Sequence, residues 1–424
     1  MTLVFLALVG GLILASILYT KTIYNLFAIL ATPYLVIVLI NQYIASPYFG
    51  FFKISDDTLI MLIEGLFAFF IGSIPFSKNN QLDNQTSFEA KSEKYNMKAM
   101  SVFVLICGLI CFVQAFLHLL QNDQIVESFD DITASLNEGW AAHLKLVVLS
   151  VVPITLYYGL KKHDFISIIG TLLVFIAVFL SFIKYNIICP IAASIIFIAL
   201  SDKKLAKRAL LAMLIIPIGL FILNYYIGFF ARGASGSVDS SFYLNHLWAY
   251  IGGSLIYDNY IFTYGIRIGV GAIEKLMTFV FAFPNMFIGK LFGIRLFPHL
   301  RQPDLMISSG YEQSNVVDAI GYLYPSYGNV SDVFEFIIVI LLIGMLFSFL
   351  FRFMLNRSIE EFNTTIAYFL AEFVLMSFFG TFYINSGPWE QLIWCAIVPR
   401  LFINKEGRES NSVATPGRRP SNVF

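Results

Sequence analysis

The sequence predicts an all-α membrane protein that crosses the bilayer many times. Hydrophobic residues make up 58% of its 424 residues and charged residues only 13%, whereas roughly 25% of the residues of a soluble domain are charged. The mean hydropathy is +0.77. A chain with so few charges does not cover a water-facing surface, so the composition excludes a soluble globular protein, a disordered chain and a fibrous protein.

Apolar runs of membrane-spanning length recur along most of the chain. A helix needs about 20 apolar residues to cross the hydrocarbon core, and about eleven runs approach or reach this length. Two of them are expected to form a tight helical hairpin that turns at Lys184-Tyr185-Asn186. The predicted spans cover residues 3–19, 24–45, 57–76, 98–120, 143–160, 166–183, 186–200, 209–230, 332–355, 365–384 and 389–403.

The connecting segments divide the chain into four regions. Residues 1–230 hold about eight predicted spans, and residues 332–404 hold the last three. Between them, residues 231–331 form a large segment that the span count places on the outer side. Residues 405–424 are polar and contain Pro, Gly and Ser, a composition that favours disorder.

Positive charge is concentrated in the loops on one side of this topology. Lys and Arg lie in loops 77–97, 161–165 and 201–208 and in the tail, whereas loop 121–142 contains five acidic residues and no Lys or Arg. Cytoplasmic loops of membrane proteins carry an excess of Lys and Arg. The sequence therefore predicts a cytoplasmic C-terminus and an N-terminus on the outer side.

Residues 231–331 have an unusual composition for a loop. The stretches 242–266 and 277–297 are rich in Phe, Tyr, Leu and Ile but are interrupted by Gly252-Gly253 and Pro284. Short, broken apolar stretches are typical of interfacial or re-entrant helices. The segment also carries cations that suit an anionic ligand, such as a lipid headgroup, a lipid-linked diphosphate or an acidic sugar. These cations are Arg232, Arg267, Lys275, Lys290, Arg295 and Arg301.

Several side chains near the outer side have two alternative roles. Tyr250 and Tyr324 belong to a group of tyrosines that either stack on sugar rings or anchor the segment at headgroup level. Lys184 and Arg232, at outer ends of spans, either bind an anion or snorkel to lipid headgroups. His246 is a candidate for a general base, and His299 is another.

The interior of the predicted spans contains few polar residues. Glu64 and Glu372 fall deep in spans, where a charge is costly and is either paired with a cation or functional. The four cysteines lie in apolar runs and are expected to pack as small hydrophobes. The sequence has no histidine cluster with metal-ligand spacing and no nucleotide-binding motif, so neither a metal ion nor a cofactor is predicted.

The span number, the large outer segment after the eighth span and the cation at a preceding hairpin turn resemble the Wzy-type polysaccharide polymerases of bacterial envelopes. Residues 247–254, LWAYIGGS, look like the aromatic-Gly-Ser stretch of that family's large loop. Residues 315–328, NVVDAIGYLYPSYG, look like its N-V-x-T…D-F-G segment, with Asp318 in place of Thr and Ser-Tyr-Gly in place of Asp-Phe-Gly. Lys184 stands where relatives carry Arg, without the adjoining glycine.

The resemblance implies a helical bundle similar to the GT-C type in the bacterial cytoplasmic membrane. The implied substrate is an oligosaccharide repeat unit on undecaprenyl diphosphate at the outer face. The implied reaction transfers the growing glycan onto another lipid-linked unit and needs no cofactor. A chain-length regulator is a candidate partner, and no nucleic acid is expected to bind.

The resemblance also suggests roles for individual residues. Cations would stabilise the lipid diphosphate as it leaves, and a base would activate the acceptor hydroxyl. Lys184 and Arg232 are the first candidates for the cationic role, followed by Arg267, Arg295 and Arg301. The candidates for the base are His246, Asp239, Asp258 and His299, and Tyr250, Asn315 and Tyr324 are expected to bind substrate.

Three other functions stay open at this point. A ligase would use the same chemistry to move a finished glycan onto a different acceptor. A lipid-linked oligosaccharide flippase would have short loops on both sides and polar residues along a central cavity, and the large outer segment argues against it. The third is a membrane assembly factor without enzymatic activity.

Overall fold

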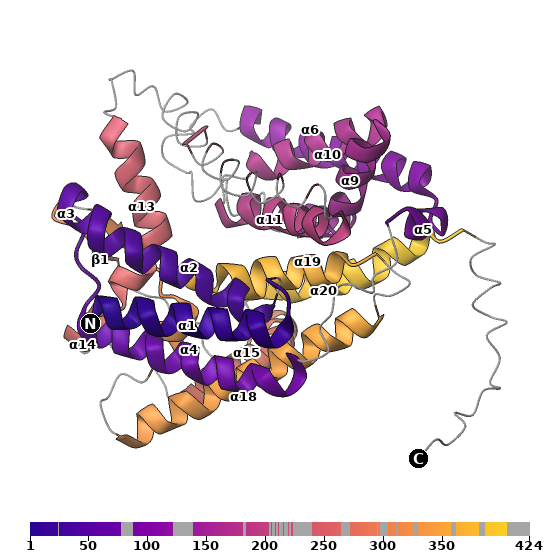
Figure 1. The fold of residues 1–424 in the computed structure, drawn as a ribbon. Coiled ribbons are helices and arrows are strands. Elements are labelled where there is room, and N and C mark those ends of the chain that lie inside the picture. Colours follow the sequence, from indigo (N-terminus) through magenta and orange to yellow (C-terminus); the bar gives the residue numbers. More distant parts are fainter. Residues whose placement is uncertain are drawn as a thin grey trace, which may run out of the picture.

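The computed structural model of the chain is a helical bundle with one short two-stranded ribbon (Figure 1). Two ends of the bundle serve as reference points: the α13 end, where α13 (Ser240–Tyr257) and the N-terminus lie, and the α5 end, where α5 (Phe88–Glu93) lies. The structure describes residues 1–23, 25–77, 88–121, 139–180, 184–202, 240–263, 272–294, 296, 304–310, 312–324, 330–357, 362–380 and 386–404, with single residues between 205 and 223.

Long apolar helices form one half of the bundle. The second of them starts at an N-cap, where the Asn25 side chain accepts a hydrogen bond from Ala28 N, an arrangement that satisfies a free amide of the first turn. The same helix widens into a π-helical turn before it ends. These elements are α1 (Thr2–Thr20), α2 (Leu26–Ile40), η1 (Asn41–Ala45), α3 (Ser46–Phe49), α4 (Asp56–Ser77) and α18 (Val330–Arg357).

α4 and α18 approach each other closely enough for their backbones to touch. A Cβ atom on Gly72 would overlap the carbonyl group of Leu341, and one on Gly344 would lie 2.7 Å from the carbonyl oxygen of Phe69. Small residues at helix interfaces permit this approach inside membranes. Ser348 Oγ adds a hydrogen bond of 2.9 Å to the carbonyl oxygen of Ser73.

The other half of the bundle is built from shorter helices. Ser101 and Ser167 join two of them through a hydrogen bond of 2.6 Å between their hydroxyl oxygens. A bend of 45° separates two others, and Pro153 in the first turn after the bend has no amide hydrogen to continue a helix. The elements are α6 (Met97–Gln121), α8 (Gly139–Leu149), α9 (Val152–Lys162), α10 (Phe165–Phe179) and α11 (Lys184–Ser201).

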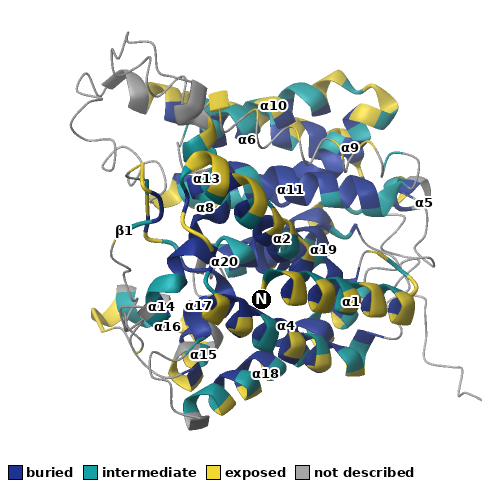
Figure 2. Ribbon diagram, turned by 60° about the vertical axis from the view of Figure 1, so that its left-hand side comes forward, coloured by how far each residue is buried: buried dark blue, intermediate teal, exposed yellow. Residues whose placement is uncertain are grey.

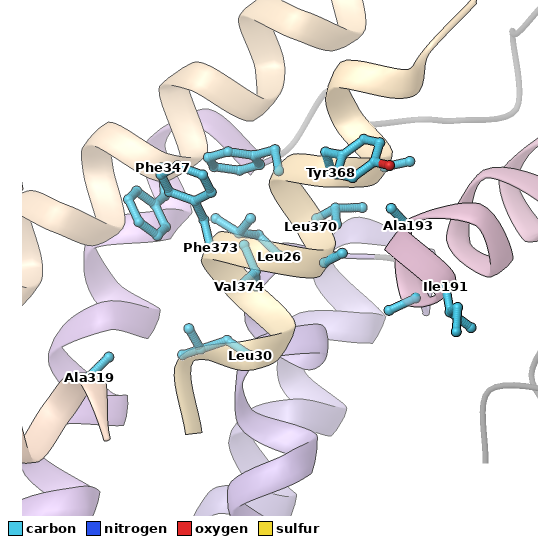
Figure 3. Close-up of a cluster of buried hydrophobic side chains, with 14 of the residues drawn as sticks. Leu26, Leu30, Ile191, Ala193, Ala319, Phe347, Tyr368, Leu370, Phe373 and Val374 are labelled. Carbon is cyan, nitrogen blue, oxygen red and sulfur yellow. The ribbon is translucent and has the colours of Figure 1, made fainter. Parts of the chain in front are cut away.

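The C-terminal helices lie between the two halves and complete the core. Figure 3 shows Phe347 and Phe373 packed together, with Leu26 and Leu30 of α2 beside them and Tyr368 farther along the same layer. The Tyr368 hydroxyl also donates a 2.8 Å hydrogen bond to Leu149 O, which ties this layer to α8. Its elements are α19 (Thr364–Tyr368), η3 (Phe369–Val374), η4 (Leu375–Phe378), α20 (Ser386–Ile397) and η6 (Val398–Phe402).

Short elements cover the α13 end. The two strands pair antiparallel, with Leu305 opposite Ser314 and Met306 opposite Gln313. This β-hairpin was not predicted from the sequence, and it lies within residues 231–331, the segment expected on the outer side. The elements here, besides α13, are α14 (Asn259–Thr263), α15 (Ala272–Val280), α16 (Ala282–Phe292), β1 (Leu305–Met306), β2 (Gln313–Ser314) and α17 (Ala319–Leu323).

The outward faces of the helices are suited to lipid. Within the described residues, five helices are long and apolar enough to cross a membrane, or six if the bent pair α8–α9 is one span. Yellow exposed positions run along the outside of the bundle in Figure 2, and on α1 they include Leu3, Leu14 and Leu18. Exposed apolar faces on this scale are characteristic of membrane spans. The chain is therefore a membrane-embedded, polytopic helical protein.

Most predicted spans coincide with helices of the structure. The predicted span at 332–355 lies within α18, and the one at 98–120 lies within α6. Most of the span predicted at 209–230 lies outside the described residues, and the total of eleven stays a prediction.

The residues of the predicted hairpin turn are helical. α10 ends at Phe179 and α11 begins at Lys184, so the predicted turn at Lys184-Tyr185-Asn186 is wrong and Lys184 is the first helical residue. Neither Lys184 nor Tyr185 breaks a helix, and Asn is tolerated in a first turn.

Candidate functional site

α13 presents a histidine and a tyrosine on one face at the α13 end. His246 and Tyr250 are four residues apart, and this spacing brings side chains together on an α-helix. Their ring centroids lie 5.3 Å apart. Tyr250 in turn stacks on Phe379, just beyond η4, with centroids 6.2 Å apart and planes at 17°. The result is a polar ring beside two stacked aromatic rings.

Glu312 of the β-hairpin is the acidic partner of His246. Nδ1 of His246 lies 3.2 Å from Oε2 of Glu312. An ionised carboxylate only accepts hydrogen bonds, so Nδ1 carries the proton in this pair and Nε2 of the neutral imidazole has a lone pair. The His246 side chain is 26% exposed and that of Glu312 is 16% exposed, so the pair is partly buried and partly accessible to solvent. This is the geometry of a general base.

The backbone around Glu312 is fixed by the hairpin and its neighbours. Ser308 Oγ accepts hydrogen bonds from Gly310 N and Glu312 N at 3.2 and 3.1 Å, and Ile307 N donates to Glu312 O at 2.8 Å. The hairpin also pairs with the link between α3 and α4, where Phe52 N donates to Ile307 O at 3.0 Å. Glu312 therefore stands on a braced turn rather than on a free loop.

Further hydrogen bonds tie α13 to η1 and to the segment before α4. Trp248 Nε1 donates a 3.1 Å hydrogen bond to Asn41 Oδ1, and Asn41 Nδ2 donates to Phe52 O at 3.0 Å. At the end of α13, Asn259 Oδ1 accepts from Ser55 N at 2.8 Å. These bonds hold α13, the hairpin and the start of α4 in one arrangement.

A second acidic group lies buried below this surface. Asp318 caps α17, and its Oδ1 accepts hydrogen bonds from Ile320 N at 2.6 Å and from Gly321 N at 3.2 Å. The Tyr34 hydroxyl of α2 lies 3.0 Å from both Asp318 Oδ1 and Ser377 O. Asp318 is thus an acceptor at the junction of α2, α17 and η4.

Asp258 lies beside Asp318 and is fully buried. Both of its carboxyl oxygens, and Oδ2 of Asp318, have no N–H or hydroxyl donor among the described residues. The two carboxyl groups lie within hydrogen-bonding reach of each other. Burial, followed by the nearby Asp318, raises the pKa of Asp258 well above its usual value. One proton held between the two groups would join one oxygen of each, with Asp258 as the donor and Asp318 as the acceptor.

Two of the predicted bases, Asp258 and His246, lie among the described residues, and they differ in exposure. Asp258 is 0% exposed and packs against Gly321, where a Cβ atom would overlap its carboxyl group. Asp258 therefore has no accessible surface in this arrangement, and its carboxyl group lies against α17. His246 is the accessible base of the two.

Other predicted site residues lie apart from the His246–Glu312 pair or outside the described residues. Tyr324 packs between Phe262 and Phe336, with ring centroids 5.2 and 4.9 Å away, so it belongs to the packing around α18. Asn315 is exposed just after β2. Lys184 starts α11, and its side chain is outside the description. Arg232, Asp239, Arg267, Arg295, His299 and Arg301 lie outside the described residues.

Four residues of these clusters, Glu312, Phe379, Tyr34 and Asp318, were missed as functional candidates in the sequence. Glu312 is 66 residues from His246, and Tyr34 is 284 residues from Asp318, so no local spacing links them. Asp318 did have a local signal, because Asp before an apolar helical turn is a preferred N-cap. Among the described residues, no group of three His, Cys, Asp or Glu side chains is arranged to hold a metal ion.

A family model described as a family of unknown function (DUF6337) matches residues 48–405 of the chain. No curated protein matches the chain, and no solved structure matches it. His246, Glu312, Asp258 and Asp318 all fall within the matched residues, whereas Tyr34 precedes them.

Proposed function

The chain belongs to the family DUF6337, whose function is unknown, and we propose that it is a membrane glycosyltransferase. The proposed substrate is an oligosaccharide repeat unit carried on undecaprenyl diphosphate. The proposed reaction joins such units into a polysaccharide at the outer face of the bacterial cytoplasmic membrane.

The His246–Glu312 pair beside Tyr250 and Phe379 is the observation that carries this proposal. A histidine oriented through Nδ1 by a carboxylate is suited to remove a proton from a hydroxyl group. Aromatic rings next to a few oriented polar groups are typical of sites for small organic ligands, and stacked rings suit the faces of sugars. An acceptor sugar is the ligand that uses both features.

The proposed reaction is a displacement at the anomeric carbon of the donor. The acceptor hydroxyl gives its proton to His246 Nε2, and its oxygen forms the new glycosidic bond. The bond between the anomeric carbon and the diphosphate oxygen breaks, and the lipid diphosphate leaves with the electron pair. Cations lower the energy of this leaving group. We assign this role to Lys184 and to the arginines of residues 231–331, with Arg232 first and Arg267, Arg295 and Arg301 after it.

The same proposal includes the finer topology predicted from the charges. It has eleven spans in a GT-C-like bundle, an outer N-terminus and a cytoplasmic C-terminus. The α13 end is then the outer end, which agrees with a site that uses substrates presented outside the cell. The α5 end, with Lys91 and Lys94, is the cytoplasmic end.

A lipid-linked oligosaccharide transporter is the second candidate. Glu64 and Glu372 lie within spanning or core helices, and Oε2 of each has no hydrogen-bond partner among the described residues. They form no ion pair there, contrary to the pairing considered from the sequence. Acidic side chains within a membrane bundle often mark an ion pathway, and this observation favours a transporter.

Deletion of the gene followed by a glycan gel separates these functions. A polymerase deletion is expected to remove the ladder of long glycans while single repeat units still reach the surface. Complete loss of surface glycan, with intermediates trapped inside the cell, would overturn the polymerase in favour of the transporter. A ligase deletion would leave long glycans on the lipid carrier instead of on their final acceptor.

Restoring the deletion strain with variants tests the assigned base. His246→Gln is expected to lower the polymerisation rate about 10²- to 10⁴-fold, the usual contribution of a general base. Glu312→Gln keeps a hydrogen bond but loses the charge, and a loss of about ten- to a hundredfold is expected. The matched control is His143→Gln, since His143 Nδ1 lies 2.7 Å from Glu390 Oε1 in a similar pair away from these rings. A normal ladder from His246→Gln, with protein present in the membrane, would remove His246 from the mechanism.

A further inference from the structure

A cavity of about 120 Å³ lies at the α5 end, far along the bundle from His246. α18, the start of α19, and the junction of α20 with η6 form its walls, together with Tyr95 just before α6. The chain segments around it are fastened together, because Asn96 N donates to Phe402 O at 2.7 Å and Asn404 N to Lys94 O at 2.9 Å. The cavity is therefore part of a fixed framework.

One wall of the cavity offers donors of hydrogen bonds. Asn363 uses its Oδ1 to cap α19, accepting from Ile366 N at 3.3 Å. This leaves the amide nitrogen, Nδ2, buried and without a hydrogen-bond partner among the described residues. A buried donor without a partner costs free energy, so an acceptor in the cavity would stabilise it. Arg400, an exposed cation, lines the same cavity.

Another part of the lining is apolar and comes from α18 and from Phe362 just before α19. Phe353, Met354 and Phe362 line it, and the apolar span on α18 ends at Leu355. The cavity thus lies at the level where a lipid headgroup meets its acyl chains. Its donors and its apolar wall match the two parts of an amphiphile.

The charge around the cavity favours an anion. Arg352 lies on α18 next to the lining residue Phe353, and Lys94 lies next to Tyr95. Lys98 follows in the first turn of α6. Basic groups at the membrane surface attract anionic lipids, and Arg binds phosphate through two parallel hydrogen bonds.

We propose that this cavity binds the phosphate group of an anionic phospholipid. Arg400 and the Asn363 amide would hold the phosphate, and an acyl chain would lie along Phe353 and Met354. The inference does not depend on the proposed glycosyl transfer, because the cavity is at the opposite end of the bundle and contains none of the residues assigned to that reaction.

Lipid binding to the purified full chain tests the proposal. Native mass spectrometry and thermal unfolding would be recorded in neutral detergent with phosphatidylglycerol, with phosphatidylcholine or with inorganic phosphate. One phosphatidylglycerol is expected to stay bound and to raise the unfolding temperature, while phosphatidylcholine does so more weakly. Arg400→Gln is expected to weaken phosphatidylglycerol binding about tenfold, as loss of a charge-assisted bond does.

Asn363→Asp separates ligand binding from folding. An aspartate keeps the cap on α19 but replaces the amide donor with a carboxylate, so it should lose phosphatidylglycerol while unfolding at a similar temperature without lipid. Arg352→Gln is the matched control, because Arg352 lies at the same end but does not line the cavity, and it should weaken phosphatidylglycerol binding less than Arg400→Gln does.

Two outcomes would overturn the proposal. Equal binding of phosphatidylglycerol to the original chain, Arg400→Gln and Asn363→Asp would show that the lipid binds elsewhere. Stabilisation by inorganic phosphate alone, with no added effect of the lipid, would show that the ligand is a soluble phosphate and not a membrane lipid.

Discussion

His246 and His143 each meet a glutamate through Nδ1, at 3.2 and 2.7 Å, yet only one of these pairs is proposed to be catalytic. The His143 side chain is 48% exposed, and its partner Glu390 also accepts a bond from Trp394 Nε1 at 3.0 Å. That pair links α8 to α20. The His246 pair has stacked rings beside it and a carboxylate held by a braced hairpin. The surroundings, rather than the pair itself, distinguish the two.

The buried carboxyl pair predicts how stability depends on pH. Because burial and Asp318 raise the pKa of Asp258, its contribution to folding is complete below the unfolded pKa of about 3.9. It is lost as the pH rises through the raised folded value. The free energy of unfolding should fall by up to about 1.4 kcal/mol per pH unit for one such proton.

Asp258→Asn tests this dependence. Asparagine keeps the shape and donates a hydrogen bond to Asp318 without titrating, so the unfolding temperature should fall less steeply than that of the original chain as the pH rises above about 5. Tyr257 is the neighbouring titratable group, and burial raises its pKa to about 12, so it stays neutral over this range. A variant with the same pH slope as the original chain would contradict the shared proton.

At the scale of helices, the sequence predicted where helices lie along the chain better than it predicted their bends and their contacts with one another. Runs of apolar residues gave the ends of α1 and α4 to within a few residues, because lipid selects for apolar length alone. The bend between α8 and α9 was not predicted, although Pro153 marks it. The β-hairpin was also missed, since its strands have two residues each and no period to detect.

The close contact between α4 and α18 predicts that one added methyl group at this interface lowers the stability of the fold. Gly72→Ala places a Cβ atom against the carbonyl of Leu341, and separating the two backbones is expected to cost about 1–3 kcal/mol. The unfolding temperature in detergent should fall accordingly. Gly11→Ala is the control, since a Cβ atom there meets nothing within 4 Å and should leave the temperature unchanged. Equal temperatures for both variants would show that this interface tolerates a wider spacing.

For the molecule as a whole, the proposed orientation predicts which end is reached from outside the cell. In a background without the four native cysteines, Gln313→Cys at the α13 end should react with a membrane-impermeant maleimide in intact cells. Lys98→Cys near the α5 end should react only after the membrane is opened. Both positions are exposed, so accessibility is not limiting. The reverse pattern would invert the topology and remove an outer site at His246.

Only part of the candidate site was predicted from the sequence. The rest was missed because its residues come from distant segments of the chain. His246 and Tyr250 were found from the chemistry of single residues and from a resemblance to polymerases. Their partners Glu312 and Phe379 were not, because the chain brings them together only through the hairpin and through η4. Asp258 was predicted as a base, but its burial against Gly321 depends on packing that no local pattern records.

The π-helical turn at Asn41–Ala45 corresponds to an α-helix into which one extra residue has been inserted. The Ser46 amide donates to Asn41 O, five residues back, so this turn holds one residue more than an α-helical turn. Removing a single residue here would rotate the side chains on one side of the turn by roughly 100° relative to those on the other. The Asn41 side chain would then point in a different direction and would lose its hydrogen bond from Trp248. A related chain one residue shorter in this turn should therefore hold α13 by a different contact, and a length comparison would reveal it without any structure.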